Sequence, residues 1–394
     1  MINKFKKKQI IYIVPQLYCF GEPINQIYYL RNLYHDQDKY QITVITYPLQ
    51  KQRINKAVYN IIMRGLNVIH SSDHDLIWFA TKKNSRRISM VKDSDNIYII
   101  YSNCELFKRH YWEYQNKVPK FRYSLTKKEY KMGHKLRDDF GIPEKAPIVT
   151  LSVRESGWFG VYDQAKAQNA NIDDYIPAIN YLIDKGFYIV RIGDKNMKQF
   201  ENPPSQFIDA PFHPAYIDLV DPYFIAVSKF FVGTPTGPFV LAEGFGIPKL
   251  GTNLLLRHDF WADKKDLLIY KSLYSYQLKR HLSYEEVLLS PLKIDFENLQ
   301  QFDIELISNT PDEILAAVKE MILRLDGIYS FPKNIASIRK HFQKVQKMAV
   351  YFNQQSADNS SYIPLHHLFD DTNFPISMEY LKSNPDYLGH DWLN

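Results

Sequence analysis

Short apolar runs alternate with longer amphipathic segments along most of the chain. Strands are predicted at residues 10–14, 42–46, 67–70, 76–79, 97–100, 148–153, 187–192, 207–210 and 230–232, with another beginning at Pro248. Helices are predicted at residues 24–34, 54–64, 125–140, 172–186, 216–228, 238–245 and 334–350, with two more beginning at Ser283 and Thr310. The strand runs are rich in β-branched residues and need cover on both faces, as in a parallel sheet. The pattern therefore predicts the α/β class, built from β-α-β units with short links.

The length of 394 residues allows two domains with full cores. We expect an N-terminal domain over residues 1–140 and a second domain over residues 141–330, followed by a helix and tail over residues 331–394. The passage between the two domains is the charged helix predicted at 125–140, which is followed by Gly141 and Pro143.

The amino-acid composition indicates a globular protein. Hydrophobic residues make up 45% and aromatic residues 15% of the chain, which is typical of a globular protein and not of a disordered one. The two cysteines, Cys19 and Cys104, lack metal-ligand spacing and indicate a reducing compartment, so we expect a cytoplasmic protein. No apolar segment approaches the length of a membrane span.

The net charge of +6 leaves two interpretations open. The basic residues, which include four lysines within residues 1–8, favour peripheral contact with an anionic membrane face, or they form a solvated basic surface. Nucleic-acid binding is not expected, because neither zinc-ligand spacing nor an aromatic-basic repeat occurs. His70 and the Asp-His-Asp triplet at residues 73–75 resemble metal ligands, but a polar turn accounts for them, and no metal site is predicted.

Two features at strand ends indicate an anion-binding site. Arg154 follows the strand at 148–153, at the end where open α/β sheets bind ligands. The turn at 234–238 joins the strand at 230–232 to a helix, and a helix start presents backbone N–H groups and a positive dipole end to a phosphate. Two independent features of this kind predict one shared crevice.

The turn itself has the sequence Thr234-Pro-Thr236-Gly237-Pro238. Its threonines can donate hydroxyl hydrogens, Gly237 lets the backbone approach a ligand, and proline is preferred at the first helical position. Taken alone, the turn is more typical of an ordinary N-cap on a core helix, since threonine caps are common. The proximity of Arg154 favours the anion-binding interpretation.

Ordered runs between residues 147 and 249 form a recognisable set. In chain order they are Ser152-Val-Arg154-Glu-Ser-Gly-Trp158, Asn169-Ala-Asn171-Ile-Asp-Asp-Tyr175-Ile-Pro-Ala-Ile179, Val190-Arg191-Ile-Gly193-Asp194, Ile208-Asp209, Asp218 and Phe231-Val-Gly233-Thr-Pro-Thr-Gly237. This set resembles bacterial glycosyltransferases of surface-polysaccharide loci that carry a (His/Ser)-Val-Arg-(Glu/Asp)-Ser-Gly-(Trp/Tyr) motif. That family is distantly similar to fucosyltransferases with a His-Val-Arg motif. Ser152 stands where relatives often carry histidine, so no imidazole chemistry is expected there.

The resemblance implies a GT-B fold, with two Rossmann-like domains facing across a cleft and a nucleotide-diphospho-sugar bound to the second domain. It also implies that the tail over residues 331–394 packs back on the N-terminal domain. In such enzymes the loop after the first strand faces the cleft, which makes Glu22 the candidate general base. The alternative for Glu22 is a surface carboxylate favoured by the dipole of the helix that follows.

The candidate site combines these positions. Catalytic roles are expected for Glu22 and Arg154. Substrate contacts are expected for Gly21, Ser152, Glu155, Asn169, Asp194, His213, Asp218, Thr234, Thr236, Gly237 and Glu243. Asp194 would accept from a ribose or base, with a turn former as the alternative, and His213 would contact a phosphate. Retaining GT-B enzymes commonly use two glutamates around the helix after this turn, and only Glu243 is matched, which favours an inverting reaction.

The sequence therefore predicts a glycosyltransferase that moves a sugar from a nucleotide-diphospho-sugar to a hydroxyl of a glycan or lipid-linked glycan, without a metal or other cofactor. It would act in bacterial surface-glycan synthesis, in the cytoplasm or peripherally at the inner membrane. A nucleotide-sugar epimerase or hydrolase, and a non-catalytic protein that binds sugar nucleotides, are the alternatives that the same features allow.

Overall fold

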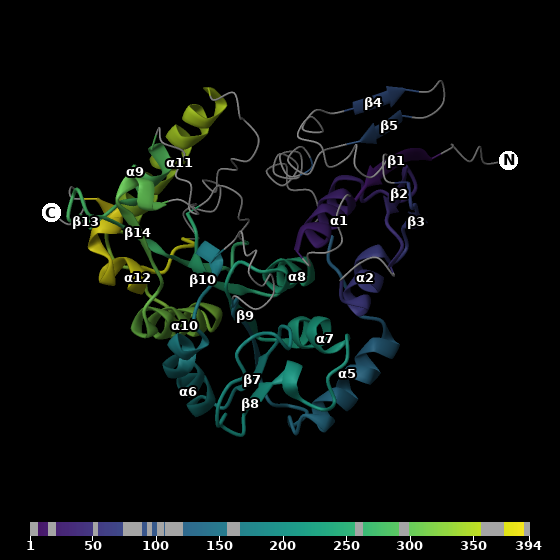
Figure 1. Ribbon diagram of the computed structural model, residues 1–394, viewed down its shortest axis with the longest axis horizontal. Helices are drawn as coiled ribbons and strands as arrows, with labels where there is room; N and C mark the ends of the chain where they lie inside the picture. Colours follow the sequence, from purple (N-terminus) through teal and green to yellow (C-terminus); the bar gives the residue numbers. More distant parts are fainter. Residues whose placement is uncertain are drawn as a thin grey trace. The chain divides into compact units, whose positions relative to one another are not determined.

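The computed structural model describes residues 7–14, 21–49, 54–73, 89–92, 97–100, 106, 121–155, 166–256, 263–290, 299–355 and 374–389 (Figure 1). The chain divides into two units. Unit 1 comprises residues 1–126 with 244–246, and unit 2 comprises 127–243 and 247–394. The helix that we expected between the domains, α5 (Lys127–Asp139), belongs to unit 2.

Unit 1 is built around a parallel sheet with the strand order β1-β2-β3. Its elements are β1 (Lys8–Ile13), α1 (Gly21–Leu33), β2 (Tyr40–Thr46), α2 (Lys56–Met63), β3 (Asn67–His70), β4 (Ser89–Lys92) and β5 (Ile97–Ile100). Strand β5 lies beside β1 and pairs antiparallel with β4. The buried Arg31 of α1 donates to the carbonyl of Ile62 in α2 at 3.0 Å, which ties the two helices together.

Unit 2 has a six-stranded, fully parallel sheet with the order β11-β10-β9-β6-β7-β8. The strands are β6 (Ile148–Ser152), β7 (Tyr188–Arg191), β8 (Phe207–Asp209), β9 (Phe230–Gly233), β10 (Lys249–Leu254) and β11 (Leu267–Tyr270). The connecting helices are α6 (Ile176–Asp184), α7 (Val220–Val227), α8 (Gly237–Phe245) and α10 (Pro311–Leu325), with short 3₁₀ turns η4 (Lys166–Gln168), η5 (Ile172–Tyr175) and η6 (Ala210–Phe212).

Helices cover both faces of this sheet, with α5 and α7 on one side and α6 and α10 on the other (Figure 1). Every residue of β6, β9, β10 and β11 is buried, as the absence of polar alternation predicts for strands covered on both faces. The α/β class with Rossmann-like units, expected of a GT-B protein, is confirmed.

A small antiparallel sheet with the order β13-β12-β14 follows β11 and was not predicted from the sequence. Its surroundings comprise β12 (Ser272–Ser275), β13 (Arg280–His281), α9 (Tyr284–Leu289), η7 (Leu299–Phe302) and β14 (Ile304–Ile307). A separate apolar cluster of Ala167, Leu255, Leu273 and Leu299 joins this sheet to the η4 turn. The cluster matters for the site, because it holds the segment that carries Gln168 and Asn169.

The C-terminal elements are α11 (Ile335–Gln355), α12 (Met378–Ser383) and η9 (Pro385–Leu388). The described tail, residues 374–389, adds to unit 2: Ile376 bridges to Leu268 of β11, and the buried Glu320 of α10 accepts from the Ser377 hydroxyl at 2.6 Å. Residues 356–373 and 390–394 lie outside the described residues, so the expected packing of the tail on the N-terminal domain stays a prediction. No helix among the described residues is long and apolar enough to span a membrane.

Candidate functional site

The carboxyl ends of β6 and β9 lie side by side, with Ser152 opposite Gly233. Beyond this pair the two chains stay joined, because the Thr234 N–H donates to the Ser152 carbonyl at 3.1 Å. The Arg154 N–H then donates to the Thr234 hydroxyl oxygen at 2.8 Å, and Thr234 is fully buried. The strand-end arginine and the threonine turn, which lie 80 positions apart in the sequence, therefore meet at one edge of the sheet.

Gly233 makes this close approach of the strands sterically feasible. A Cβ at this position would lie 2.3 Å from the Ser152 carbonyl oxygen, which is a backbone atom and cannot rotate away. The spacing of β6 and β9 thus depends on the absence of a side chain at the last residue of β9.

The half-buried Arg154 side chain is held by two uncharged amide oxygens. Its Nε donates to Asn169 Oδ1 at 3.2 Å, and one terminal nitrogen donates to Gln168 Oε1 at 3.1 Å. The Ala170 N–H also donates to the Arg154 carbonyl at 2.9 Å. These contacts orient the guanidinium group without a carboxylate taking part in them. Asn169 was among the predicted site residues, whereas Gln168, its neighbour, was missed.

The turn after β9 leads directly into α8, which begins at Gly237, one residue before the predicted start. The Thr236 carbonyl accepts from the Val240 N–H at 3.4 Å, so Thr236 occupies the position before the helix. Its hydroxyl oxygen is buried and has no hydrogen-bond partner among the described residues, so the side chain does not cap the helix. A buried hydroxyl without a partner is unfavourable unless a ligand completes its hydrogen bonds.

Lys271, which sequence reasoning missed, lies on the other side of Asn169. Its ammonium group donates to the Asn169 carbonyl at 2.6 Å, and the residue is only 7% exposed. Burial lowers the pKa of Lys271 to about 8. The available signal was the same as for Arg154, a charged residue directly after a buried strand, but the strand β11 had not been predicted.

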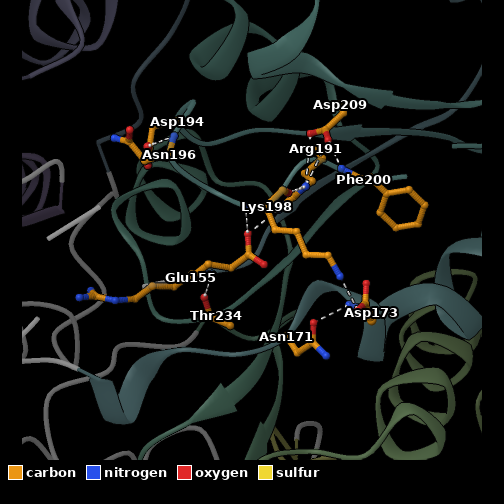
Figure 2. Close-up of polar contacts among 11 residues, drawn as sticks. Glu155, Asn171, Asp173, Arg191, Asp194, Asn196, Lys198, Phe200, Asp209 and Thr234 are labelled. Atoms are coloured by element: carbon orange, nitrogen blue, oxygen red, sulfur yellow. Dashed lines mark hydrogen bonds and ion pairs between the residues drawn. The ribbon is translucent and has the colours of Figure 1, made fainter. Parts of the chain in front are cut away.

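Glu155 points away from Arg154 toward the neighbouring strand β7. Its Oε2 accepts from the fully buried Arg191 at 2.8 Å and from the Lys198 N–H at 3.0 Å (Figure 2). Arg191 also pairs with Asp209 of β8 at 3.2 Å. Burial raises the pKa of Glu155, and the charge of Arg191 opposes that rise. One carboxylate oxygen of this predicted substrate ligand is therefore already used by the fold.

Three other predicted ligands serve local turns. The Asp194 carboxylate accepts from the Asn196 N–H at 2.7 Å, which is the turn-forming alternative for this residue (Figure 2). His213 accepts from the Ala215 N–H at 3.2 Å. Asp218 is exposed in the segment before α7. Their contacts with a substrate stay predictions.

Glu243 is placed differently from the expectation. It is buried on α8, where its carboxylate pairs with Lys249 at 3.1 Å, and Lys249 is also 3.3 Å from Asp266. Lys249 is the first residue of β10, whereas Arg154 follows the carboxyl end of β6, so the two positions lie at opposite edges of a parallel sheet. The geometry gives Glu243 a structural task in joining α8 to β10.

The predicted catalytic base lies in unit 1. Gly21 and Glu22 are the first two residues of α1. Residues 15–20, which form most of the loop before this helix, and the Glu22 side chain lie outside the described residues. The role of Glu22 as a general base therefore stays a prediction.

No family model matches the sequence, and no curated protein matches it. Several solved structures are similar at low identity. A glycosyl transferase family 9 protein from Veillonella parvula is 10% identical, with 68% of this chain and 86% of that chain covered and a TM-score of 0.45. E. coli ADP-heptose LPS heptosyltransferase II is 14% identical, with 62% and 84% covered and a TM-score of 0.37. S. aureus MnaA, solved with UDP, is 13% identical, with 90% and 100% covered and a TM-score of 0.34. At this level of similarity the neighbours assign no role to individual residues.

Proposed function

We propose that the protein is a glycosyltransferase that binds the diphosphate of a nucleotide-diphospho-sugar at the carboxyl edge of the unit 2 sheet. The observation that carries the proposal is the hydrogen bond from the Arg154 N–H to the Thr234 hydroxyl oxygen, 2.8 Å long. It joins a guanidinium-bearing strand end to the start of α8, so that two features suited to an anion share one location.

In this proposal three groups at the carboxyl ends of the strands interact with the diphosphate in different ways. The guanidinium group of Arg154, oriented by Gln168 and Asn169, donates to phosphate oxygens. The Thr236 hydroxyl, which lacks a partner among the described residues, donates one more hydrogen bond. The amino end of α8 adds a positive dipole end.

In the reaction that we propose, a base removes the proton from the acceptor hydroxyl while its oxygen attacks the anomeric carbon. The bond from that carbon to the diphosphate breaks, and its electron pair leaves on the phosphate oxygen. Arg154 and the turn at 234–237 stabilise this developing charge, which is the step where fixed donors accelerate transfer most. Glu22 is the base in this proposal, and a single displacement of this kind inverts the anomeric centre.

The acceptor in this proposal is a glycan or a lipid-linked glycan of the bacterial surface, used at the cytoplasmic face of the membrane. The support for a membrane-proximal site is the net charge of +6, which favours an anionic surface. No metal or cofactor is required, because protein donors stabilise the leaving group.

Binding of nucleoside diphosphates to wild-type protein and to Arg154→Ala tests the proposal. A thermal-shift panel of ADP, GDP, UDP and CDP identifies the base, and calorimetry gives Kd. Arg154→Ala should lower the affinity for the diphosphate about 30-fold or more, because charge-assisted hydrogen bonds contribute about 1.5–3 kcal/mol each. Lys229→Ala is the matched control: Lys229 is an exposed cation before β9, at the opposite edge of the sheet, so affinity should not change.

Donor turnover separates the three candidate functions. A transferase consumes nucleotide sugar only when an acceptor is present, an epimerase or hydrolase consumes or converts it alone, and a binding protein does neither. An Arg154→Ala variant that keeps wild-type affinity for every diphosphate would contradict the proposed site.

A further inference from the structure

A second cation reaches the same edge of the sheet from β11. Lys271 directly follows this strand, and its N–H donates to the Leu254 carbonyl at the end of β10 at 2.8 Å. Its ammonium group donates to the carbonyl of Asn169 at 2.6 Å. The side chain therefore crosses from the outer strand of the sheet to the segment that orients Arg154.

Among the described residues, no acid compensates the buried charge of Lys271. Its hydrogen-bond acceptor is an uncharged carbonyl, and among the described residues no carboxylate pairs with it. Lys249, which is also buried, has two acidic partners, because it lies 3.1 Å from Glu243 and 3.3 Å from Asp266. A buried ammonium group with uncharged surroundings is costly for folding, and such groups mark anion or reaction sites.

Asn169 places Lys271 and Arg154 in one site. The Asn169 side-chain oxygen accepts from Arg154 Nε at 3.2 Å, while its backbone oxygen accepts from Lys271 Nζ at 2.6 Å. A guanidinium group and an ammonium group thus contact the same residue. One of the three N–H bonds of the ammonium group is used by Asn169, and no further acceptor for this group is found among the described residues.

The strand end that carries Lys271 is held rigidly. The register of β10 with β11 shifts between Gly251 and Leu254, and Asn253 within this shift has the left-handed φ of 53°. Asn253 and Asn309 exchange two hydrogen bonds, of 2.6 and 2.8 Å, and the Asn309 amide donates to the Tyr270 carbonyl at 2.8 Å. Strand irregularities of this kind are common beside active sites, where they re-aim a side chain.

We propose that Lys271 binds the phosphate groups of the nucleotide donor as a second cation, next to Asn169. This inference depends on the proposed nucleotide-sugar site. The alternative is that Lys271 is a structural link, fastening the segment at 166–170 through the Asn169 carbonyl. Phosphate binding requires the positive charge of Lys271, whereas the structural link requires only its hydrogen bond to the Asn169 carbonyl.

Affinity for nucleosides with different numbers of phosphates tests the proposal. We compare wild type, Lys271→Met and the control Lys229→Met by calorimetry, with the nucleoside, monophosphate and diphosphate of the base that the thermal-shift panel selects. Lys271→Met should lower the affinity for the diphosphate about 10- to 100-fold, because the phosphate contact is lost. Its affinity for the nucleoside should fall less than about twofold. Lys229→Met should change none of the three. Equal weakening of nucleoside and diphosphate would overturn the proposal and support the structural link.

Thermal stability without ligand gives a second readout. A buried ammonium group without a counter-charge lowers the stability of the ligand-free protein. If the task of Lys271 is to bind phosphate, Lys271→Met should therefore keep or raise the melting temperature. A structural link should lower it. If Lys271→Met fails to fold, the pH dependence of binding to wild-type protein decides between the two roles, and binding without proton uptake would overturn the proposal.

The pH dependence of binding to wild-type protein needs no variant. The free ammonium group, with its pKa lowered to about 8 by burial, is protonated at neutral pH, and a bound phosphate raises its pKa. Diphosphate affinity should therefore change little between about pH 7 and pH 8, where the phosphates are ionised and Lys271 is mainly protonated, and fall above pH 8 by at most about tenfold per pH unit. Calorimetry in Tris and HEPES should show proton uptake near pH 8.5.

The Lys271→Met variant distinguishes Lys271 from other charged or ionisable groups on the contacting elements. Among the described residues these include Arg154 after β6, Lys166 on η4 and the phenol of Tyr270 on β11, and burial raises the pKa of Tyr270. Proton uptake that persists in Lys271→Met would assign the pH effect to one of them and count against the proposal. Wild-type protein that binds no nucleoside diphosphate would refute the proposed function itself. Wild-type protein that binds one, with Lys271→Met binding equally well, would refute only the role of Lys271.

Discussion

Replacement of Arg191 by leucine should destabilise unit 2 by about 3–5 kcal/mol, because it leaves two buried carboxylates without their cation. Arg191 is fully buried, and it lies 2.8 Å from Glu155 and 3.2 Å from Asp209, whose side chains are 13% and 7% exposed. It also donates to the Lys198 carbonyl at 2.7 Å, so the loop after β7 loses a fixed point as well.

The expected destabilisation of about 3–5 kcal/mol is that of breaking one buried ion cluster, and it is not a sum over the separate hydrogen bonds. Asp209 keeps the N–H of Phe200 at 2.8 Å, and Glu155 keeps the N–H of Lys198 at 3.0 Å, so neither carboxylate is left without a donor. For a unit of this size each kcal/mol lowers the melting temperature by roughly 2–4 °C, which gives a fall of about 6–20 °C. The matched control is Arg280→Leu, which removes a partly exposed pair with Glu286 and should cost about 1 kcal/mol or less.

The loss of stability in Arg191→Leu should become smaller as the pH falls. Burial already raises the pKa of Glu155 and Asp209, and Arg191 opposes that rise. Without Arg191 both folded-state pKa values rise further above the unfolded values of about 4. The penalty is therefore complete above the raised pKa values and disappears as the pH falls through them toward 4, where both carboxyl groups are protonated.

Chemical denaturation of wild type, Arg191→Leu and Arg280→Leu at pH 7 and pH 4.5 measures these differences. Adding Glu155→Gln and Asp209→Asn to Arg191→Leu should recover much of the stability at pH 7, because the uncompensated charges are removed. An Arg191→Leu penalty equal to that of Arg280→Leu, or one that stays constant between the two pH values, would refute the reasoning.

Two further predictions concern the frame of the site. Gly233→Ala should cost about 1–3 kcal/mol in denaturation, because its methyl group would lie 2.3 Å from the Ser152 carbonyl oxygen and would force β6 and β9 apart; unchanged stability would mean that the strands separate freely. Glu320→Gln should cost about 1.5–3 kcal/mol, because the buried carboxylate accepts from the Ser377 hydroxyl at 2.6 Å and from two backbone N–H groups at 3.1 and 3.2 Å. Limited proteolysis should then cut within residues 374–389 faster than in wild type, and an unchanged rate would argue against Glu320 as the anchor of this segment.

Local signals in the sequence predicted much of the fold. The strand at β6 was found from its apolar run, and the start of α10 from Thr310 and the proline that follows it. The structure contains the corresponding capping box, in which the Thr310 hydroxyl oxygen accepts from the Glu313 N–H at 3.3 Å and the Glu313 carboxylate accepts from the Thr310 N–H at 2.8 Å. Such signals succeed because the interacting groups lie within one helical turn of each other.

Contacts between distant residues were not predictable in this way. Arg191 meets Glu155 across 36 positions, and no local pattern indicates that pairing. Lys271 was missed because β11, the four-residue strand directly before it, was not predicted. Gln168 was missed because no local pattern indicates its contact with Arg154, which lies 14 positions earlier.

The adjacent charges of the Arg154-Glu155 pair illustrate why a motif alone does not give roles. Strand β6 lies between β7 and β9, and Arg154 and Glu155, the second and third residues after its end, contact different neighbours. The Arg154 backbone joins the turn after β9, and its side chain meets uncharged amides, whereas Glu155 closes an ion cluster with the buried Arg191 of β7. Glu155 therefore compensates Arg191 and not its neighbour in sequence. The neighbouring charges of this motif therefore serve different parts of the sheet, because Glu155 pairs with Arg191 of β7 while the Arg154 backbone joins the turn that precedes α8.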